Sequence, residues 1–220
     1  MPEQNFKSDL FDQFARIGKA LSSGKRLEML EFLAQGERSV ELLANMTGLS
    51  IANTSQHLQQ LRLVGLVTAR KGGLYVHYRI AGDGIVRLLA TLRAVGEENL
   101  AEVNRLVKLF LDSKDNLEPV PAKELWQRAK HGLVTVLDVR PPEEYAQGHI
   151  RGAINVPMTE LKKMLHQLPA DQEVVAYCRG PYCVLAYEAV QILRKKGIKA
   201  RRMEDGYPEW RLRGLPVDMG

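Results

Sequence analysis

The pattern of apolar residues changes across one short segment, DSKDNLEPVP at residues 112–121. The segment is polar and carries two prolines, which is typical of a linker between domains. Helical spacing of apolar residues dominates before it, whereas runs of strand length alternate with amphipathic helical stretches after it. At 220 residues the chain is long enough for two cores of about 100 residues each. We therefore expect two domains of different architecture, one on each side of this segment.

The first part of the chain has the pattern of four helices. Residues 6–21 carry apolar residues at helical spacing. Ser23, Ser39 and Ser50 stand where the N-caps of three further helices are expected, since a serine hydroxyl can accept a hydrogen bond from a free backbone N–H. The third helix, VELLANM, and the fourth, IANTSQHLQQLRLVG, are separated by a tight turn around Gly48. A short helix, a glycine turn and a helix with a polar face are the parts of a helix-turn-helix.

A hairpin and a long helical stretch follow the fourth helix. Residues 74–80 alternate as a strand does, and Arg70-Lys71-Gly72-Gly73 is expected to form the hairpin tip. Helical spacing returns over residues 85–111, with an interruption near Gly96. These patterns predict an N-terminal all-α winged helix-turn-helix domain with a β-hairpin wing.

The first domain is basic. Residues 16–87 contain ten Lys and Arg against five Asp and Glu, and this excess of five equals the net charge of the whole chain, +5. A solvated basic surface, or a three-helix domain that binds nothing, would give the same pattern. However, short amide and hydroxyl side chains suit base readout in the major groove, and basic wing residues suit phosphate contacts. The candidate DNA-binding residues are Ser50, Asn53, Thr54, Ser55, Gln56, His57, Gln59 and Gln60 on the fourth helix, with Arg70 and Lys71 on the hairpin.

Three segments of the first domain carry a family pattern: ALSSGKRLEML, LSIANTSQHLQQLRLVGLV and RKGGLYVHYRI. They resemble the second helix, the recognition segment and the wing of the ArsR family of bacterial repressors, over about residues 8–95. The resemblance implies a homodimer, joined through its first and last helices, on a palindromic operator in double-stranded DNA. Members of this family often sense metals, but the third helix here, RSVELLA, has no cysteine, and DGIVR in the last helix has one acid. We therefore expect no metal site in this domain, and an inducer that acts elsewhere.

The second half contains both cysteines of the chain, Cys178 and Cys183. They lie between a strand-like run, EVVAY, and an amphipathic helix, VLAYEAVQILRKKG, in a region that predicts an α/β sheet. Their loop therefore follows the carboxyl end of a strand and precedes a helix N-terminus, where ligands bind and a thiolate is stabilised. A zinc site needs more ligands, and His149 and His166 are isolated. A reactive thiolate remains as an interpretation, beside a transient disulfide and a buried structural cysteine.

The segments VLDVRPPEEYAQGHIRGAINVP, VVAYCRGPYC and MEDGYPEW resemble a single rhodanese domain over about residues 119–218. The resemblance implies an α/β fold with a mainly parallel central sheet. It also implies that Cys178 takes the outer sulfur of a donor as a persulfide and passes it to a thiol or a cyanide-like acceptor. Cys183 stands where many rhodaneses have arginine or serine. It either resolves the persulfide by forming a disulfide with Cys178, or is a small residue that faces the helix.

The candidate catalytic residues all lie in the second domain. Arg179 is expected to add positive charge next to the thiolate, and Asp138 and Arg140 are expected to organise the loop. The six-residue loop has the size found in the sulfur-transfer domains that the sequence resembles. The related phosphatases of this fold have a longer loop that ends in arginine. The full set is Cys178, Arg179, Gly180, Tyr182, Cys183, Asp138 and Arg140.

Together these patterns predict a winged helix domain over residues 1–96, a helical linker over 97–118 and a rhodanese-like domain over 119–220. We expect a cytoplasmic transcriptional regulator, a repressor, whose rhodanese domain senses or carries reactive sulfur through Cys178. A sulfurtransferase with an attached DNA-binding domain is the alternative, and an arsenate reductase or phosphatase is disfavoured by the short loop. The expected partners are operator DNA, a second copy of the chain and a sulfane-sulfur donor or thiol acceptor. No cofactor or membrane is expected, since no apolar run approaches the roughly 18 residues of a membrane span.

Overall fold

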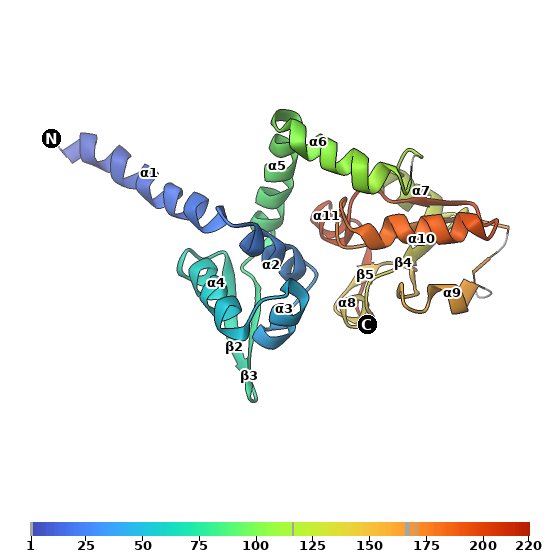
Figure 1. The fold of residues 1–220 in the computed structure, drawn as a ribbon, viewed down its shortest axis with the longest axis horizontal. Helices are drawn as coiled ribbons and strands as arrows, with labels where there is room; N and C mark the ends of the chain where they lie inside the picture. Colours follow the sequence, from blue (N-terminus) through green and yellow to red (C-terminus); the bar gives the residue numbers. More distant parts are fainter. Residues whose placement is uncertain (1, 116, 166–167, 170) are drawn as a thin grey trace. The chain divides into compact units, whose positions relative to one another are not determined.

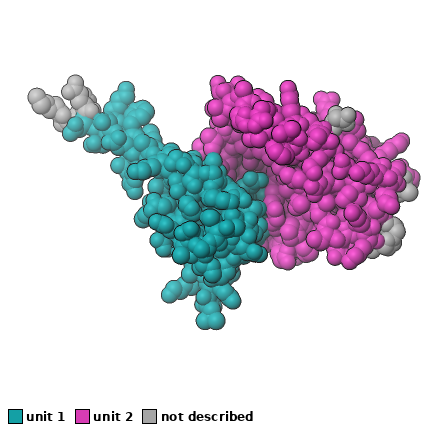
Figure 2. Space-filling view, viewed as in Figure 1, with its two compact units in different colours: residues 1–85 teal, residues 86–220 magenta. Residues whose placement is uncertain are grey.

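The structure, a computed structural model, describes residues 2–115, 117–165, 168–169 and 171–220. The chain forms two compact units, residues 1–85 and residues 86–220 (Figure 2). This division falls earlier than the boundary expected at residue 96, and it places the segment predicted as a linker, 97–118, in the second unit. Among the described helices, none is both long enough and apolar enough to cross a membrane.

The first unit contains the helix-turn-helix (Figure 1). The hydroxyls of Ser39 and Ser50 accept hydrogen bonds from the N–H groups of Leu42 and Asn53, each at 3.2 Å, so both act as the N-caps that the sequence predicts. Gly48 ends the third helix with φ of 67°, a left-handed conformation that strains other residues. The helices are α1 (Pro2–Leu21), α2 (Gly24–Ala34), α3 (Val40–Thr47) and α4 (Ile51–Leu63).

The wing is a hairpin in a three-stranded antiparallel sheet. Strands β2 (Val67–Gly72) and β3 (Tyr75–Ile80) pair along their length, and the short β1 (Arg38–Ser39) adds to the other edge of β3. Because Gly72 pairs with Tyr75, the turn consists of residues 73 and 74 only. The hairpin tip is therefore further along the chain than expected, and Arg70 and Lys71 lie within β2.

The long helical stretch of the sequence is divided into α5 (Asp83–Asn99), α6 (Ala101–Val107) and the π-helical turn η1 (Lys108–Asp112). The interruption expected near Gly96 lies at Leu100, whose backbone is extended with φ of −112° and ψ of 99°. After η1, the buried carboxylate of Asp115 accepts a hydrogen bond of 2.8 Å from Nη1 of Arg194. This contact helps to explain why the predicted linker belongs to the second unit.

The second unit is an α/β domain around a four-stranded parallel sheet in the order β6-β4-β7-β8. Figure 1 shows α10 running along this sheet. Helix α7 (Ala122–Lys130) and an antiparallel pair, β5 (His149–Ile150) with β9 (Val217–Asp218), were not expected from the sequence. The remaining elements are β4 (Val134–Asp138), α8 (Pro142–Ala146), β6 (Ile154–Asn155), α9 (Leu161–Met164), β7 (Glu173–Tyr177), α10 (Val184–Lys195), β8 (Ala200–Arg202) and α11 (Tyr207–Leu212).

Strand β7 is buried on both faces of the sheet, as its apolar sequence predicts. Val174 and Ala176 belong to one hydrophobic cluster, which α9 and α10 complete, and Val175 and Tyr177 belong to another, which α7 and α11 complete. Cys178 continues the first of these alternating sets. It therefore lies at the end of β7 on the α10 side of the sheet. His166, whose isolation argued against zinc, lies outside the described residues.

Candidate functional site

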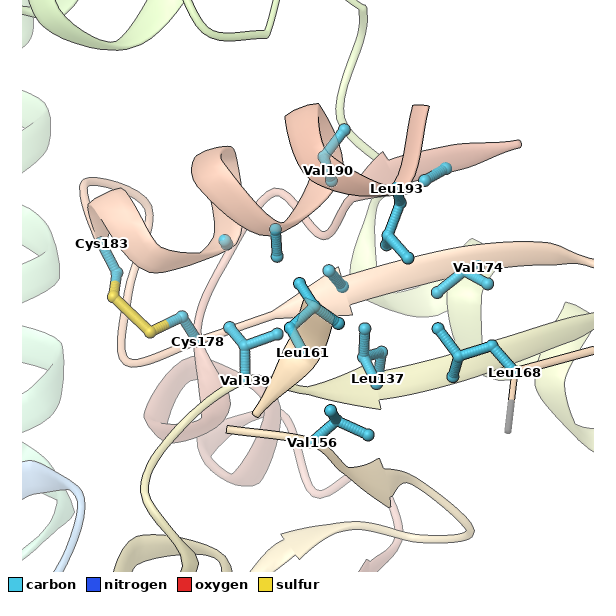
Figure 3. Close-up of a cluster of buried hydrophobic side chains, with 14 residues drawn as sticks. Leu137, Val139, Val156, Leu161, Leu168, Val174, Cys178, Cys183, Val190 and Leu193 are labelled. Atoms are coloured by element: carbon cyan, nitrogen blue, oxygen red, sulfur yellow. A yellow bond between two sulfur atoms is a disulfide. The ribbon is translucent and has the colours of Figure 1, made fainter. Parts of the chain in front are cut away.

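The loop of residues 178–183, CRGPYC, which we call the thiol loop, joins β7 to α10. Cys178 is 1% exposed and Cys183 is 9% exposed, and their sulfur atoms are joined in a disulfide across a Cα–Cα distance of 6.1 Å. Figure 3 shows this disulfide at the end of the hydrophobic cluster, beside the first turn of α10. Cys183 is the N-cap residue of α10, so the pair lies at the positive end of the helix dipole, which stabilises a thiolate.

The backbone of the thiol loop is held from two directions. Within the loop, the N–H of Cys183 donates to the carbonyl of Gly180 at 3.1 Å. From outside, the N–H of Tyr207 donates to the carbonyl of Cys178, also at 3.1 Å. Gly206 lies so close that a Cβ atom at this position would overlap with the backbone of Arg179 and Gly180. The segment before α11 therefore sets the position of the loop.

We expect Gly206→Ala to displace the thiol loop. The added methyl group has no space, so the free energy of unfolding of the second unit should fall by about 1–3 kcal/mol, and the disulfide should form more slowly after reduction. Denaturant unfolding and thiol titration over time measure the two effects. Gly96→Ala is the matched control within the second unit, because a Cβ there meets only Cγ2 of Val103, at an ordinary contact distance of 3.9 Å. Equal disulfide formation in both variants would contradict this account of Gly206.

Arg179 does not present a free positive charge to the cysteines. Its Nε lies 3.0 and 3.1 Å from the two carboxylate oxygens of Glu144 on α8, and its Nη2 lies 2.8 Å from Oε1. The Glu144 side chain is only 2% exposed, so this is a buried, bidentate ion pair. The pair neutralises most of the charge that the sequence suggests beside the thiolate, and it ties the thiol loop to α8.

Asp138 and Arg140 form a fully buried network beneath the loop. Nη2 of Arg140 lies 2.6 Å from Oδ2 of Asp138 and 2.9 Å from the carbonyl oxygen of Gly148. The Tyr177 hydroxyl donates to the same Asp138 oxygen, and the guanidinium carbon lies 4.4 Å from the ring centre of Tyr207. Burial opposes the charge of Arg140, but the hydrogen bonds and the charge of Asp138 outweigh it and raise its pKa. Both side chains are 0% exposed.

Tyr182 is the member of the thiol loop that reaches the helices of residues 86–112. Its hydroxyl donates a hydrogen bond to Oε1 of Glu97 on α5. Burial, together with this hydrogen bond and the charge of Glu97, raises the pKa of Tyr182, so the phenol remains a neutral donor. The sequence indicated neither Glu97 nor Glu144 as a partner of the loop. Glu209 was missed too, although it lies at capping-box spacing from Gly206, whose N–H donates to its Oε2 at 3.2 Å.

On helix α4, the predicted DNA-binding residues fall into those that are buried or already make a contact within the unit and those that are exposed. Thr54 is 0% exposed, which corrects its assignment, because its side chain faces the interior of the folded unit. Ser50 uses its hydroxyl as the N-cap, and the half-buried His57 has Nδ1 at 3.5 Å from Nη1 of Arg26. Ser55 is half-buried as well. The exposed members of this set are Asn53, Gln56, Gln59 and Gln60, together with the capping residue Ser50.

On the wing, Arg70 and Lys71 are both exposed. Arg70 makes a two-pronged ion pair with Glu37, in which its Nε lies 2.8 Å from Oε2. The guanidinium would have to leave this carboxylate, or share it, to contact a phosphate. In the part of the chain that the structure describes, no three His, Cys, Asp or Glu side chains gather into a candidate metal site.

Comparison with known proteins yields two family matches. Residues 23–69 match the bacterial regulatory protein arsR family, and residues 121–213 match the rhodanese-like domain. The HTH-type transcriptional regulator Rv0324 of Mycobacterium tuberculosis is 49% identical over 214 residues, which are 97% of this chain and 94% of that protein. A sulfurtransferase of Allochromatium vinosum is 33% identical over 85 residues, 38% of this chain and 78% of its own.

Among solved structures, the homodimeric winged helix-turn-helix fragment 1–100 of Mb0332 from Mycobacterium bovis is 49% identical. The match covers 43% of this chain and 87% of that one, with a TM-score of 0.41. The sequence relationship to Rv0324 extends through both units, and the family matches coincide with the helix-turn-helix and with the α/β unit that holds the thiol loop. The chain therefore belongs to the arsR family of bacterial HTH-type transcriptional regulators, with a rhodanese-like domain behind its DNA-binding domain.

Proposed function

We propose that this regulator is a cytoplasmic repressor that releases its operator when sulfane sulfur reacts with Cys178. The proposal rests on one observation, the pairing of Cys178 with Cys183 in a rhodanese-like loop of a DNA-binding regulator. A cysteine that only filled space in the core would not need a second sulfur within bonding distance. In this proposal Cys183 resolves what Cys178 receives.

The proposed chemistry has two steps. The Cys178 thiolate attacks the outer sulfur of a persulfide donor, R–S–SH, whose S–S bond breaks and whose inner sulfur leaves as the thiolate RS⁻ with the electron pair. The Cys183 thiolate then attacks Sγ of the Cys178 persulfide. A Cys178–Cys183 disulfide forms, and the outer sulfur leaves as HS⁻. The two cysteines are oxidised and the transferred sulfur is reduced to sulfide, and cellular dithiols reset the pair by exchange.

We also propose a homodimer on a palindromic operator. Two helices carry apolar faces whose exposure to water would be unfavourable in a monomer. On α1, Phe6, Phe11 and Phe14 are 67%, 58% and 56% exposed, and on α5, Leu92 and Val95 are 42% and 50% exposed. Exposed aromatic and aliphatic side chains in such a row are typical of a surface that a second copy covers.

Operator binding tests the sensing proposal directly. Affinity for the protein's own promoter fragment is measured by fluorescence anisotropy before and after polysulfide treatment. The wild type should bind about a hundredfold more weakly after treatment, a difference of about 2.7 kcal/mol between states. Cys178→Ser should bind the untreated operator like the wild type and lose the response. If this variant still releases the operator after polysulfide treatment, Cys178 is not the sensor.

A second candidate function is catalytic sulfur transfer, which is favoured by the similarity to the Allochromatium vinosum sulfurtransferase. In that case Cys178 takes the outer sulfur of thiosulfate, releasing sulfite, and passes it to cyanide as thiocyanate. Many turnovers of thiosulfate with cyanide by the full chain would favour the enzyme. A single turnover that ends in the disulfide would favour the sensor.

A further inference from the structure

Helix α5 contacts the environment of the thiol loop at two points, one turn apart. Glu97 accepts the hydrogen bond from Tyr182 inside the loop, and Arg93 binds the carboxylate of Glu209 on α11. Residues 93 and 97 are four apart, so both side chains project from the same face of α5. All four residues lie within the second unit, residues 86–220.

The two contacts differ in what they depend on. Glu209 is anchored by the N–H of Gly206, so the Arg93 contact ends on α11 and does not involve a loop side chain. Tyr182, in contrast, is the residue immediately before Cys183. Any change in the bond between the cysteines acts on the backbone that carries the Tyr182 ring. Of the two contacts, the one between Glu97 and Tyr182 is made by the direct neighbour of a cysteine.

An extra sulfur atom on Cys178 would enter a buried apolar cluster. Cys178 is 1% exposed and is packed in the cluster that Figure 3 shows, so a persulfide there would press against its neighbours. The loop between Cys178 and Cys183 is the part that can move. The disulfide joins the two ends of this loop, so the loop loses that constraint when the disulfide is absent. The Tyr182 hydroxyl is then expected to leave Glu97.

The segment that follows α5 is held to α10 at its far end. Nζ of Lys114 lies 3.0 Å from Oε1 of Glu188 on α10, and Asp115 is held by Arg194 of the same helix. Between the two ends, the Tyr182 ring borders an apolar cavity of about 370 Å³. The other residues that line this cavity are Val103, Leu106, Val107, Phe110, Leu111 and Val184. Displacement of Tyr182 would therefore act on α6 and η1, which line the cavity, and on the last turn of α5 through Glu97.

The opposite face of α5 is the one proposed for the dimer. With about 3.6 residues per turn, Leu88, Leu92 and Val95 share one side of the helix, and Arg93 and Glu97 lie on the other. The three apolar residues are 37%, 42% and 50% exposed. One helix thus presents an uncovered apolar face on one side and a contact with the thiol loop on the other.

We propose that Tyr182 and Glu97 form a latch that transmits the covalent state of the Cys178–Cys183 pair to α5, and through it to the dimer. The latch is closed when the disulfide is present and opens when the cysteines are reduced or Cys178 carries a persulfide. This regulation rests on the proposed sensor function, but the latch has its own structural readout.

Amide hydrogen exchange in the full chain tests the latch without DNA. The disulfide form is compared with the form reduced by a dithiol, which becomes a disulfide itself as it supplies two electrons and two protons. In the wild type, the backbone amides of residues 95–105 should exchange about tenfold more slowly in the disulfide form than in the reduced form. The reason is that the hydrogen bond from Tyr182 to the Glu97 carboxylate is lost when the latch opens in the reduced form. Glu97→Ala and Tyr182→Phe should abolish the difference, because each removes one partner of the hydrogen bond, and Glu98→Ala, at the exposed neighbouring residue, should keep it. Equal exchange in the two wild-type forms, or a difference that survives in Tyr182→Phe, would overturn the latch.

Operator binding separates the latch from the sensor. Glu97→Ala should still form the Cys178–Cys183 disulfide after polysulfide treatment, detected by mass spectrometry as the loss of two hydrogens, yet lose most of the hundredfold operator response. If the wild type responds, Cys178→Ser does not, and Glu97→Ala responds fully, the latch is wrong and the sensor stands. If hydrogen exchange shows the latch but polysulfide leaves wild-type DNA binding unchanged, the latch stands and the proposed sensor function is wrong.

Discussion

Replacing Asp138 by asparagine is expected to lower the free energy of unfolding of the second unit by about 3–5 kcal/mol. The guanidinium of Arg140 is 0% exposed, and Asp138 is the carboxylate that balances its charge, with atoms 2.6–3.1 Å apart. An asparagine has nearly the same shape as the aspartate but leaves the buried positive charge of Arg140 without its counter-charge. One of the two carboxylate oxygens is also replaced by an NH₂ group, which cannot accept the hydrogen bonds that Arg140 and Tyr177 donate. The Tyr177 hydroxyl loses a charged acceptor as well.

Denaturant unfolding followed by tryptophan fluorescence measures this loss. Both tryptophans of the chain, Trp126 and Trp210, lie in the second unit with ring centres 6.5 Å apart, so their signal reports on that unit alone. The control is Asp112→Asn, at an exposed carboxylate, which should change the free energy by less than about 0.5 kcal/mol. A loss below about 1 kcal/mol in the Asp138 variant would mean that this ion pair does not organise the domain.

Cys183→Ser is expected to convert a transient persulfide into a stable one. In the proposed chemistry of the wild type, the Cys183 thiolate removes the outer sulfur as HS⁻ and leaves a Cys178–Cys183 disulfide, the bond that the structure contains. Serine cannot do so, because a neutral hydroxyl is a poor nucleophile toward sulfur. Mass spectrometry of the peptide that contains residues 174–194 should then show one added sulfur atom on Cys178 of the variant. For the wild type it should show the loss of two hydrogens, and sulfide should be released in equal amount.

The matched control for this experiment is Cys178→Ser, which should neither gain sulfur at position 178 nor release sulfide. Equal sulfide release by the wild type and by Cys183→Ser would show that Cys183 is a bystander. The sensor would then have to signal through the persulfide alone.

Much of the fold was predictable because its signals are local. Ser39 and Ser50 cap their helices through the N–H group three residues on, and the Val-rich run of β7 leads directly into the loop and α10. Short-range hydrogen bonding and periodicity specify such features within a few residues. The short strands β5 and β9 were not predicted because two residues have no periodicity, and each strand forms only by pairing with a distant one, as His149 does with Asp218, 69 positions away.

By itself, the sequence determined the two domain types, the position of the thiol loop between a strand and a helix, and most of the polar face of α4. These follow from patterns that are read along the chain. Tertiary structure alone decided that Thr54 faces inward, that Arg179 is neutralised by Glu144, and that Tyr182 reaches Glu97. The physical reason is that a charge or a hydroxyl acquires its partner only when packing brings distant segments together, and residues 97 and 182 lie 85 positions apart.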